Sequence, residues 1–212
     1  EAVFNILREY IKESKAIRFD GDSYGEAWEK EAKKRGLSNN KTTPEALKVK
    51  ITKRVIDLFE EMEVMNKIEL EARYEIELEL YTKRVQIESR VLGDIARNHI
   101  VPTAIIYQNT LLENTKNIKE IFGDDFKNIA KEQIELIMII SNHITEINSL
   151  VNKMIDQRKK ANTLSGLISS EDYCHKVKPF FEQIRYHCDK LETMVDDNLW
   201  PLTKYRELLF TK

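Results

Sequence analysis

Residues 68–80 read IELEARYEIELEL, and this segment decides the fold class of the chain. Apolar and polar residues alternate almost perfectly, which is the pattern of a half-buried β-strand. The polar positions are mostly Glu, however, and the apolar ones include Leu and Ala, which favour helices over strands. We therefore predict a helix from about Lys67 to His99, with Asn66 and Glu69 as a capping pair at its start. The alternation then puts apolar residues on two faces of this helix, so we expect neighbours on both sides.

Two further long segments carry apolar residues every three or four positions, the spacing of amphipathic helices. They span residues 129–154 and 173–194. Pro102 and Pro179 lie within helical patterns, and we expect disturbed helices there, because proline lacks the backbone N–H and its ring collides with a carbonyl. Pro102 should break or kink its helix, and Pro179 should kink its helix or mark the true start. Long helices joined by short loops predict an antiparallel bundle. We expect the stripe of Leu136, Ile140, Ile144, Ile147 and Val151 to pack against the stripe of Phe180, Ile184, Leu191 and Met194.

Shorter helices are predicted before Asn66, near residues 24–35, 45–49 and 53–61. The predicted fold is therefore all-α: an antiparallel bundle of long, Pro-kinked helices preceded by several short helices. We place the seam at Asn66, which gives a first part of residues 1–66 and a long-helix part of residues 67–212. Helical spacing is present from Ala2 onward, so we expect the natural chain to continue upstream.

The charge balance gives no sign of a nucleic-acid or anionic-membrane partner, because 34 basic and 36 acidic residues leave a net charge of −2. We interpret Arg158-Lys159-Lys160 as a solvated helix end. The chain shows no apolar run of transmembrane length. Its two cysteines, Cys174 and Cys188, are expected to be reduced thiols of a cytoplasmic protein.

The segment from Asp20 to Glu31 overlays the spacing of a calcium-binding loop. Tyr24 occupies a position that needs an oxygen ligand close to the backbone, and Trp28 suits a helix face better than a loop. We therefore favour a capped helix start, with Trp28 packed inward, over a calcium site.

Other candidate ligands do not converge. Cys174 and Cys188 would lie about 21 Å apart along one helix, so together with His175 and His187 they cannot close a zinc site. Asn98 and His99 precede Pro102, where either could bind the carbonyls freed by a kink; a catalytic role for His99 would need a partner nucleophile that the chain does not offer. We predict no catalytic, cofactor-binding or metal-binding residue in this chain.

The end of the chain carries a distinctive series of motifs: RYHCDKL at 185–191, VDD at 195–197, LWPL at 199–202 and KYRELLF at 204–210. A second series has YTK at 81–83, IESRVLGD at 87–94 and NHIVP at 98–102. Together they resemble the C-terminal region of type III glutamine synthetases, the large bacterial form of that enzyme, from about Phe19 to Phe210. Residues 43–81 resemble, more weakly, the helical end of the catalytic domain shared by all glutamine synthetases.

The resemblance implies a parent enzyme that joins ammonia to glutamate with ATP and Mg or Mn. In the family the metal ligands and the arginines that hold ATP and glutamate precede the position of Glu1, so none is carried over here. The implied partners are the remainder of the parent chain and further copies of it in a homo-oligomer. The alternative is a different class of protein, an autonomous helical adaptor that binds partner helices.

The last residues are rich in large apolar and aromatic side chains, which should not stay in water. We expect them to pack onto the bundle or onto a neighbouring subunit. Trp200, Tyr205 and Phe210 are accordingly the predicted docking or assembly residues.

Overall fold

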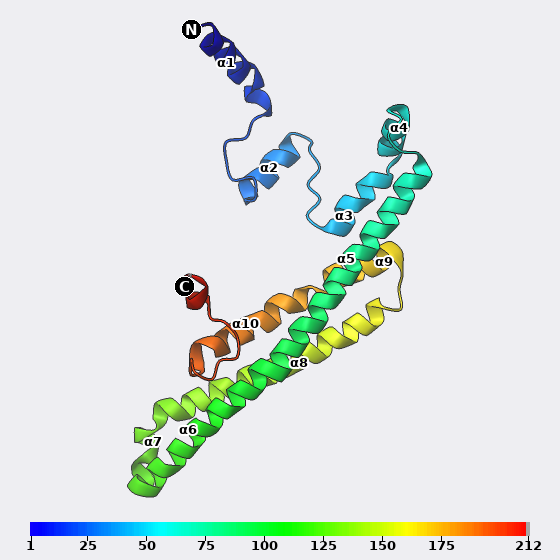
Figure 1. Ribbon diagram of the computed structural model, residues 1–212. Coiled ribbons are helices and arrows are strands. Elements are labelled where there is room, and N and C mark those ends of the chain that lie inside the picture. The colour runs from blue at the N-terminus through cyan, green and yellow to red at the C-terminus, as the bar shows by residue number, and fades with distance from the viewer. Residues whose placement is uncertain (211–212) are drawn as a thin grey trace. The chain divides into compact units, whose positions relative to one another are not determined.

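The computed structural model describes residues 1–210, except for the side chains of Tyr205 and Arg206, and within that range it contains helices and loops but no strand (Figure 1). The predicted all-α class is therefore confirmed. The chain divides by its internal contacts into two compact units, Glu1–Ala46 and Leu47–Lys212. This division falls earlier than the seam at Asn66, because the turn at Val49–Ile51 and the helix at Lys53–Glu61 contact the long helix that follows.

The first unit contains α1 (Ala2–Glu13), a 3₁₀ turn (Ser14–Ile17) and α2 (Glu26–Lys34). The phenyl ring of Phe19 packs against the indole of Trp28, with ring centroids 5.0 Å apart. Arg35 fixes the end of α2, because its Nε donates to Glu31 at 2.6 Å and its Nη2 donates to the carbonyl of Arg18. None of the residues of α1 is buried.

The second unit begins within α3 (Thr43–Lys48), which continues into a 3₁₀ turn (Val49–Ile51) and α4 (Lys53–Glu61). A small core forms where Leu47 meets Tyr74 and Leu78, with Ile51 and Leu167 packed against it. Lys50 adds an ion pair to Glu77 at 2.6 Å. These contacts attach the short helices to the long helix α5 (Lys67–Ile95).

Residues 68–80 lie within helix α5, so the helix propensity of Glu, Leu and Ala predicted the structure correctly and the strand-like alternation did not. The predicted capping box is present: Asn66 accepts from the N–H of Glu69 at 3.0 Å, and Glu69 accepts from the N–H of Asn66 at 2.8 Å. Both interactions satisfy backbone donors that the first turn of a helix leaves free. The start of the helix at Lys67 follows from this cap.

The helix does not stop at His99. A π-helical segment (η3, Ala96–Ile100) joins α5 to α6 (Val101–Phe122), so Pro102 lies in the first turn of α6. Pro179 likewise begins α10 (Pro179–Met194), directly after a second π segment (η5, Tyr173–Val177). Each π segment ends two residues before a proline. The wider turn removes the clash between the proline ring and the carbonyl four residues earlier, so the helices are distorted rather than broken.

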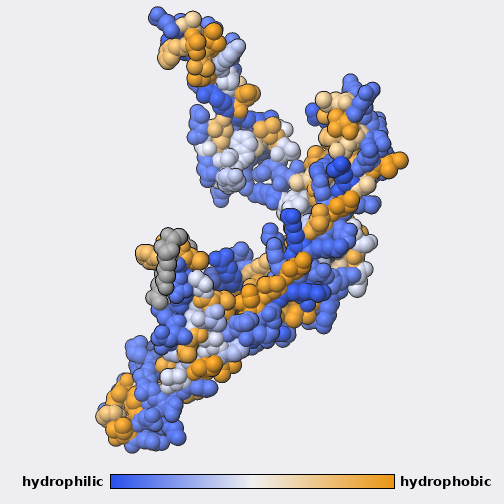
Figure 2. Space-filling view, in the orientation of Figure 1, coloured by the Kyte–Doolittle hydropathy of each residue, from blue (hydrophilic) through white to orange (hydrophobic). Residues whose placement is uncertain are grey.

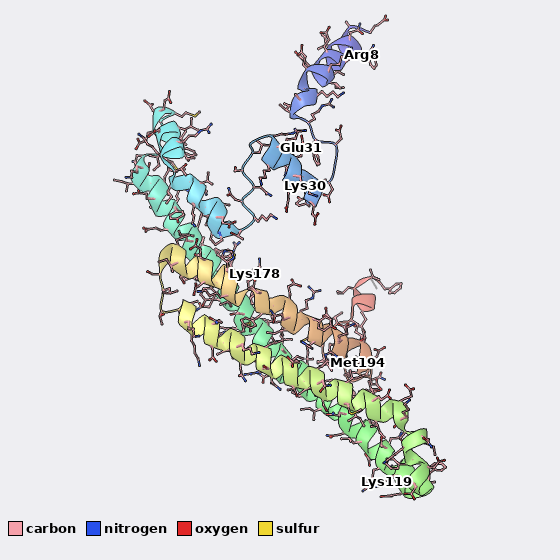
Figure 3. All side chains as sticks on the ribbon, turned by 180° about the vertical axis from the view of Figure 1, so that it is seen from behind. Arg8, Lys30, Glu31, Lys119, Lys178 and Met194 are labelled. Atoms are coloured by element: carbon pink, nitrogen blue, oxygen red, sulfur yellow. The ribbon has the colours of Figure 1, made fainter. Side chains whose placement is uncertain are left out.

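After α6 the chain turns through Gly123, whose φ of 59° suits glycine, and through the short α7 (Phe126–Ile129) into α8 (Lys131–Ala161). Helix α9 (Gly166–Asp172) and η5 then lead into α10, which lies along α8 in Figure 1. Lys178 and Met194 mark the two ends of α10 in Figure 3. The predicted pairing of the two apolar stripes is confirmed, because α8 and α10 share the main core of the second unit.

That core contains Ile140, Ile147, Val151, Ile184 and Leu191, all essentially inaccessible to solvent. Leu136, Ile144, Phe180 and Met194 are only partly buried and pack on its edge. Ile144 therefore packs at the edge of the core, whereas Ile147 on the same helix is fully buried.

The two apolar faces of α5 differ in their exposure to solvent. Leu70, Tyr74 and Leu78 are buried, whereas Ile68, Ile76 and Leu80 on the other face are at least half exposed. Figure 2 shows the hydrophobic band that runs along α5. The expectation of neighbours on both sides is therefore not met within the described chain, where only one face is covered.

Candidate functional site

The loop from Asp20 to Glu31 forms a helix start. Asp22 Oδ1 accepts from the N–H of Tyr24 at 2.9 Å, as in a local turn, and α2 begins at Glu26 after Gly25. Glu31, which would be the last calcium ligand, is instead bound to Arg35, and this hydrogen bond lowers the pKa of Glu31. Trp28 is partly buried against Phe19. Asp22 and Glu31, two of the candidate calcium ligands, therefore make hydrogen bonds within the helix and its start.

The two cysteines are structural in this arrangement. Cys174 lies in η5 and Cys188 in α10, and both thiols are free and buried. Burial, followed by the nearby charge of Asp189, raises the pKa of Cys188 to about 12. The thiolate, which is the reactive form, is therefore scarce at neutral pH. Among the described residues no group of three or more His, Cys, Asp or Glu side chains could hold a metal ion.

The structure brings together a histidine pair that the sequence reasoning missed. His143 on α8 and His187 on α10 lie with their Nδ1 atoms 2.8 Å apart. One ring must therefore donate its N–H while the other accepts, which limits the pair to at most one added proton. Burial lowers the pKa of His143, and the charges of His187 and Lys190 lower it further. The pairing follows from the register of α8 against α10, which the sequence alone does not specify.

We expect this pair to make the stability of the bundle depend on pH. Because the folded-state pKa of His143 lies below its value in an unfolded chain, the unfolded state binds more protons as the pH falls below about 6.5. The stabilising contribution is therefore complete above that pH and is lost as the pH falls. The melting temperature should decrease between pH 7 and pH 5, and His143→Gln should flatten that dependence. An equal pH slope in both proteins would contradict the assignment.

Asn98 and His99 are exposed and do not bind the carbonyls near Pro102. Asn98 Nδ2 instead donates to Asp94 Oδ1 at 2.5 Å. The carbonyl of His99 accepts from Thr103 Oγ1 at 2.9 Å, so a threonine on the following turn does what was expected of Asn98 or His99. The π segment places both side chains outward.

A cavity of about 590 Å³ lies between α5 and the loop that joins α8 to α9. Its walls include the carboxylates of Glu75 and Glu79, the hydroxyl of Thr82 and the ammonium group of Lys83. Lys83 is paired with Glu79 at 2.6 Å, and Thr82 shares a hydrogen bond with Ser170 at 2.8 Å. The ammonium group and the hydroxyl thus have local partners, so the geometry indicates a surface hollow rather than a catalytic arrangement.

The terminal segment is attached to the bundle through its first half. Trp200 is buried within the main core, and Lys204 Nζ lies 5.8 Å from the centre of its ring. The same ammonium group donates to the carbonyl of Glu192 at 3.0 Å and forms an ion pair with Asp197. It therefore ties the segment to the end of α10, where a cation is favourable.

The second half of the segment, which includes α11 (Tyr205–Leu208), is not covered in the described chain. Phe210 is 78% exposed, and Leu208 and Leu209 are also mostly exposed. The side chain of Tyr205 lies outside the described side chains. Of the three predicted docking residues, Trp200 packs onto the bundle and Phe210 does not.

Residues 2–119 match the family model of the glutamine synthetase C-terminal domain. The chain belongs to this family. The match covers more than half of the chain and includes α1 through most of α6, in agreement with the resemblance of the motifs at 81–102.

Similar proteins extend the match beyond the family model. The chain is 47% identical to a glutamine synthetase from Bacteroides fragilis and 29% identical to a type-3 glutamine synthetase from Dictyostelium discoideum, in each case over its whole length. A glutamine synthetase from Butyrivibrio fibrisolvens is 26% identical to it. The chain spans only 29–30% of the length of these relatives. The helices after residue 119, including the histidine pair and the terminal segment, therefore belong to the region that these glutamine synthetases share.

The candidate ligands, thiols and cavity residues of the described chain do not form a catalytic arrangement. Asp22 and Glu31 make local hydrogen bonds, the thiols are buried, and Lys83 and Thr82 in the cavity have local partners. No described helix is long and apolar enough to cross a membrane. What the described chain does carry is uncovered apolar surface on α1, on α5 and at its end.

Proposed function

We propose that this chain is the C-terminal helical part of a glutamine synthetase, with a role in the structure and assembly of the parent enzyme and no active site of its own. The observation that carries this proposal is the uncovered apolar face of α1 in a chain that aligns with less than a third of its relatives' length. A surface helix without a buried residue has nothing to stabilise its fold by packing.

The exposed side chains of α1 form a continuous apolar stripe, in contrast with the polar residues of the opposite face. Single exposed apolar residues are ordinary, but a contiguous patch of this kind marks a contact surface. Burial of each large side chain would contribute about 1.5–3 kcal/mol. The upstream part of the parent chain is the partner that we propose for this stripe, which comprises Val3, Phe4, Ile6, Leu7, Tyr10 and Ile11.

In this proposal the chemistry belongs to the rest of the parent chain. That part would bind ATP and Mg or Mn and would join ammonia to glutamate, with the metal ions neutralising the charge on the phosphates. The parent would be a cytoplasmic homo-oligomer. This chain would contribute to contacts within and between its subunits.

The isolated chain should show no γ-glutamyl transfer above blank in an assay with manganese and nucleotide. In the parent enzyme, Leu7→Asp should lower activity at least tenfold, because it places a charge in the proposed contact of α1. Arg8→Asp is the matched control, since Arg8 lies on the polar face of the same helix (Figure 3). It should leave activity within about twofold of wild type.

Turnover by the isolated chain would overturn the proposal that it has no active site. A parent enzyme that keeps wild-type activity with Leu7→Asp would show that α1 does not pack onto it. That second outcome would favour the alternative, an autonomous adaptor whose apolar faces bind other proteins.

A further inference from the structure

A small cavity of about 240 Å³ lies between α5, η3 and α8, and three arginines line it. Arg90 and Arg97 come from the first two of these segments, and Arg158 comes from α8. Gly93 faces α8 here: a Cβ on it would lie 3.4 Å from a methyl group of Val151, an ordinary van der Waals contact. The three arginines therefore line a hollow between the helices that is open to solvent, and Arg90 itself is exposed.

The charges that line this cavity do not balance. Asp94 is the only carboxylate on its wall, and Asp94 Oδ1 is hydrogen-bonded to Asn98. Three guanidinium groups against one carboxylate leave a net charge of +2 on the lining. None of the three arginines forms an ion pair with a described acidic residue.

Two of the positive charges oppose each other across the helices. Partial burial lowers the pKa of Arg158, and the nearby charge of Arg90 lowers it further. Two cations held together in this way destabilise each other unless an anion lies between them. Among the described residues that line the cavity, the single carboxylate of Asp94 cannot balance three guanidinium groups.

Arg97 shows the same lack of a counter-charge. Its Nη2 donates to the carbonyl of Asn148 at 3.0 Å and to Asn152 Oδ1 at 2.5 Å, both neutral acceptors. Its Nε is buried without a hydrogen-bond partner among the described residues. A buried donor without a hydrogen-bond partner lowers the stability of the folded state, so the position of this guanidinium group is unfavourable in the absence of a further acceptor. Its position fixes one wall of the cavity.

We propose that this cavity binds a small oxyanion, with a phosphate group held between Arg90 and Arg158 and beside the positive charge of Arg97. The planar fork of arginine matches the oxygens of phosphate and carboxylate, and charge-assisted hydrogen bonds of this type are strong. A doubly charged anion would neutralise the net charge of the lining. Ser89 Oγ already donates to the carbonyl of Gln86 at 2.7 Å, so the guanidinium groups are the donors for the ligand.

The site is independent of the proposed parent activity, because every residue that forms it belongs to this chain. It would join α5 to α8 through an ion that both helices bind. Binding of phosphate should therefore raise the melting temperature of the chain as well as produce a saturable heat of binding.

Titration calorimetry of the full 212-residue chain with inorganic phosphate at constant ionic strength tests this inference. Wild type should bind one phosphate per chain. Arg90→Gln and Arg158→Gln should each weaken binding about tenfold or more, because each removes a charge-assisted contact. Arg84→Gln is the matched control, since Arg84 is an exposed residue of α5 that does not line the cavity. It should change the affinity by less than about twofold.

A second measurement separates a binding role from a packing role. In phosphate-free buffer Arg158→Gln should keep or raise the melting temperature, because it removes a like-charge repulsion. The increase in melting temperature on adding phosphate should be absent from that variant. A parallel titration with adenosine monophosphate distinguishes a free phosphate from a phosphate carried by a nucleotide. If adenosine monophosphate does not bind, the cavity accepts only the free ion.

Absence of saturable phosphate binding by wild type would overturn the inference. An equal loss of affinity in Arg84→Gln would do the same, because it would show non-specific attraction to a basic surface. A large fall in the melting temperature of Arg158→Gln without phosphate would assign Arg158 to packing instead.

Discussion

Replacement of Ile147 by alanine is expected to lower the free energy of unfolding of this chain by about 2–5 kcal/mol. Ile147 lies on α8 with no solvent-exposed surface, in the core that α8 shares with α10. The substitution removes three carbon atoms and leaves a cavity that close-packed neighbours cannot fill. Urea unfolding followed by circular dichroism at 222 nm measures this loss.

Met138→Ala on the same helix is the matched control, because Met138 is 54% exposed. It should change the free energy of unfolding by less than about 0.5 kcal/mol. Similar losses for both variants would mean that α8 does not present the face containing Ile147 to α10. The arrangement of the bundle would then be incorrect.

Replacement of Trp200 by alanine should lower the free energy of unfolding by about 3–5 kcal/mol, although this residue lies after α10, in the last 13 residues of the 212-residue sequence. Chain ends fray unless burial or hydrogen bonds hold them, and Trp200 is held by the main core and by the contacts of Lys204. The same urea titration should therefore show a midpoint shift as large as that of a central core variant.

The double variant Leu209→Ser, Phe210→Ser is the control for Trp200. Both side chains are mostly exposed in the described chain, so their loss should leave the unfolding midpoint of the isolated chain unchanged. A small effect of Trp200→Ala would show that the terminal segment is detached in solution. A large effect of the double variant would show that residues 209–210 pack on the bundle.

Helix positions in this chain could be predicted from local signals. The helix at residues 53–61 and the cap at Asn66 agree with the structure, because apolar spacing and a capping box are encoded within a few residues. Residues 68–80 also formed the predicted helix, since Glu and Leu favour it more strongly than alternation favours a strand. The same alternation could not show which apolar face would be covered.

The π segments could not be foreseen from the prolines alone. Pro102 and Pro179 predicted a disturbance, but whether a helix breaks, kinks or widens depends on packing around it. The widening also changed the direction of Asn98 and His99, so their expected contacts with free carbonyls did not form.

Groups from distant segments were the hardest to predict. His143 and His187 are 44 positions apart, and Arg90 and Arg158 lie on different helices. Arg158 lies in the last turn of α8, as the interpretation of a helix end predicts, but the sequence did not show that it would line a cavity beside a second arginine. Such pairs follow from the register of two packed helices, which a single sequence does not specify.

We propose that uncovered apolar surfaces of this chain form contacts between subunits of the parent enzyme. Light scattering tests this central claim most directly, because it measures the molar mass of the parent enzyme in solution. The variant Leu209→Ser, Phe210→Ser leaves the isolated chain intact in this account, so any effect on the parent must come from a contact outside the described chain. We predict that the parent carrying this variant forms a smaller assembly than wild type at the same concentration. An unchanged molar mass, with unchanged activity, would contradict the proposed assembly role of the terminal segment.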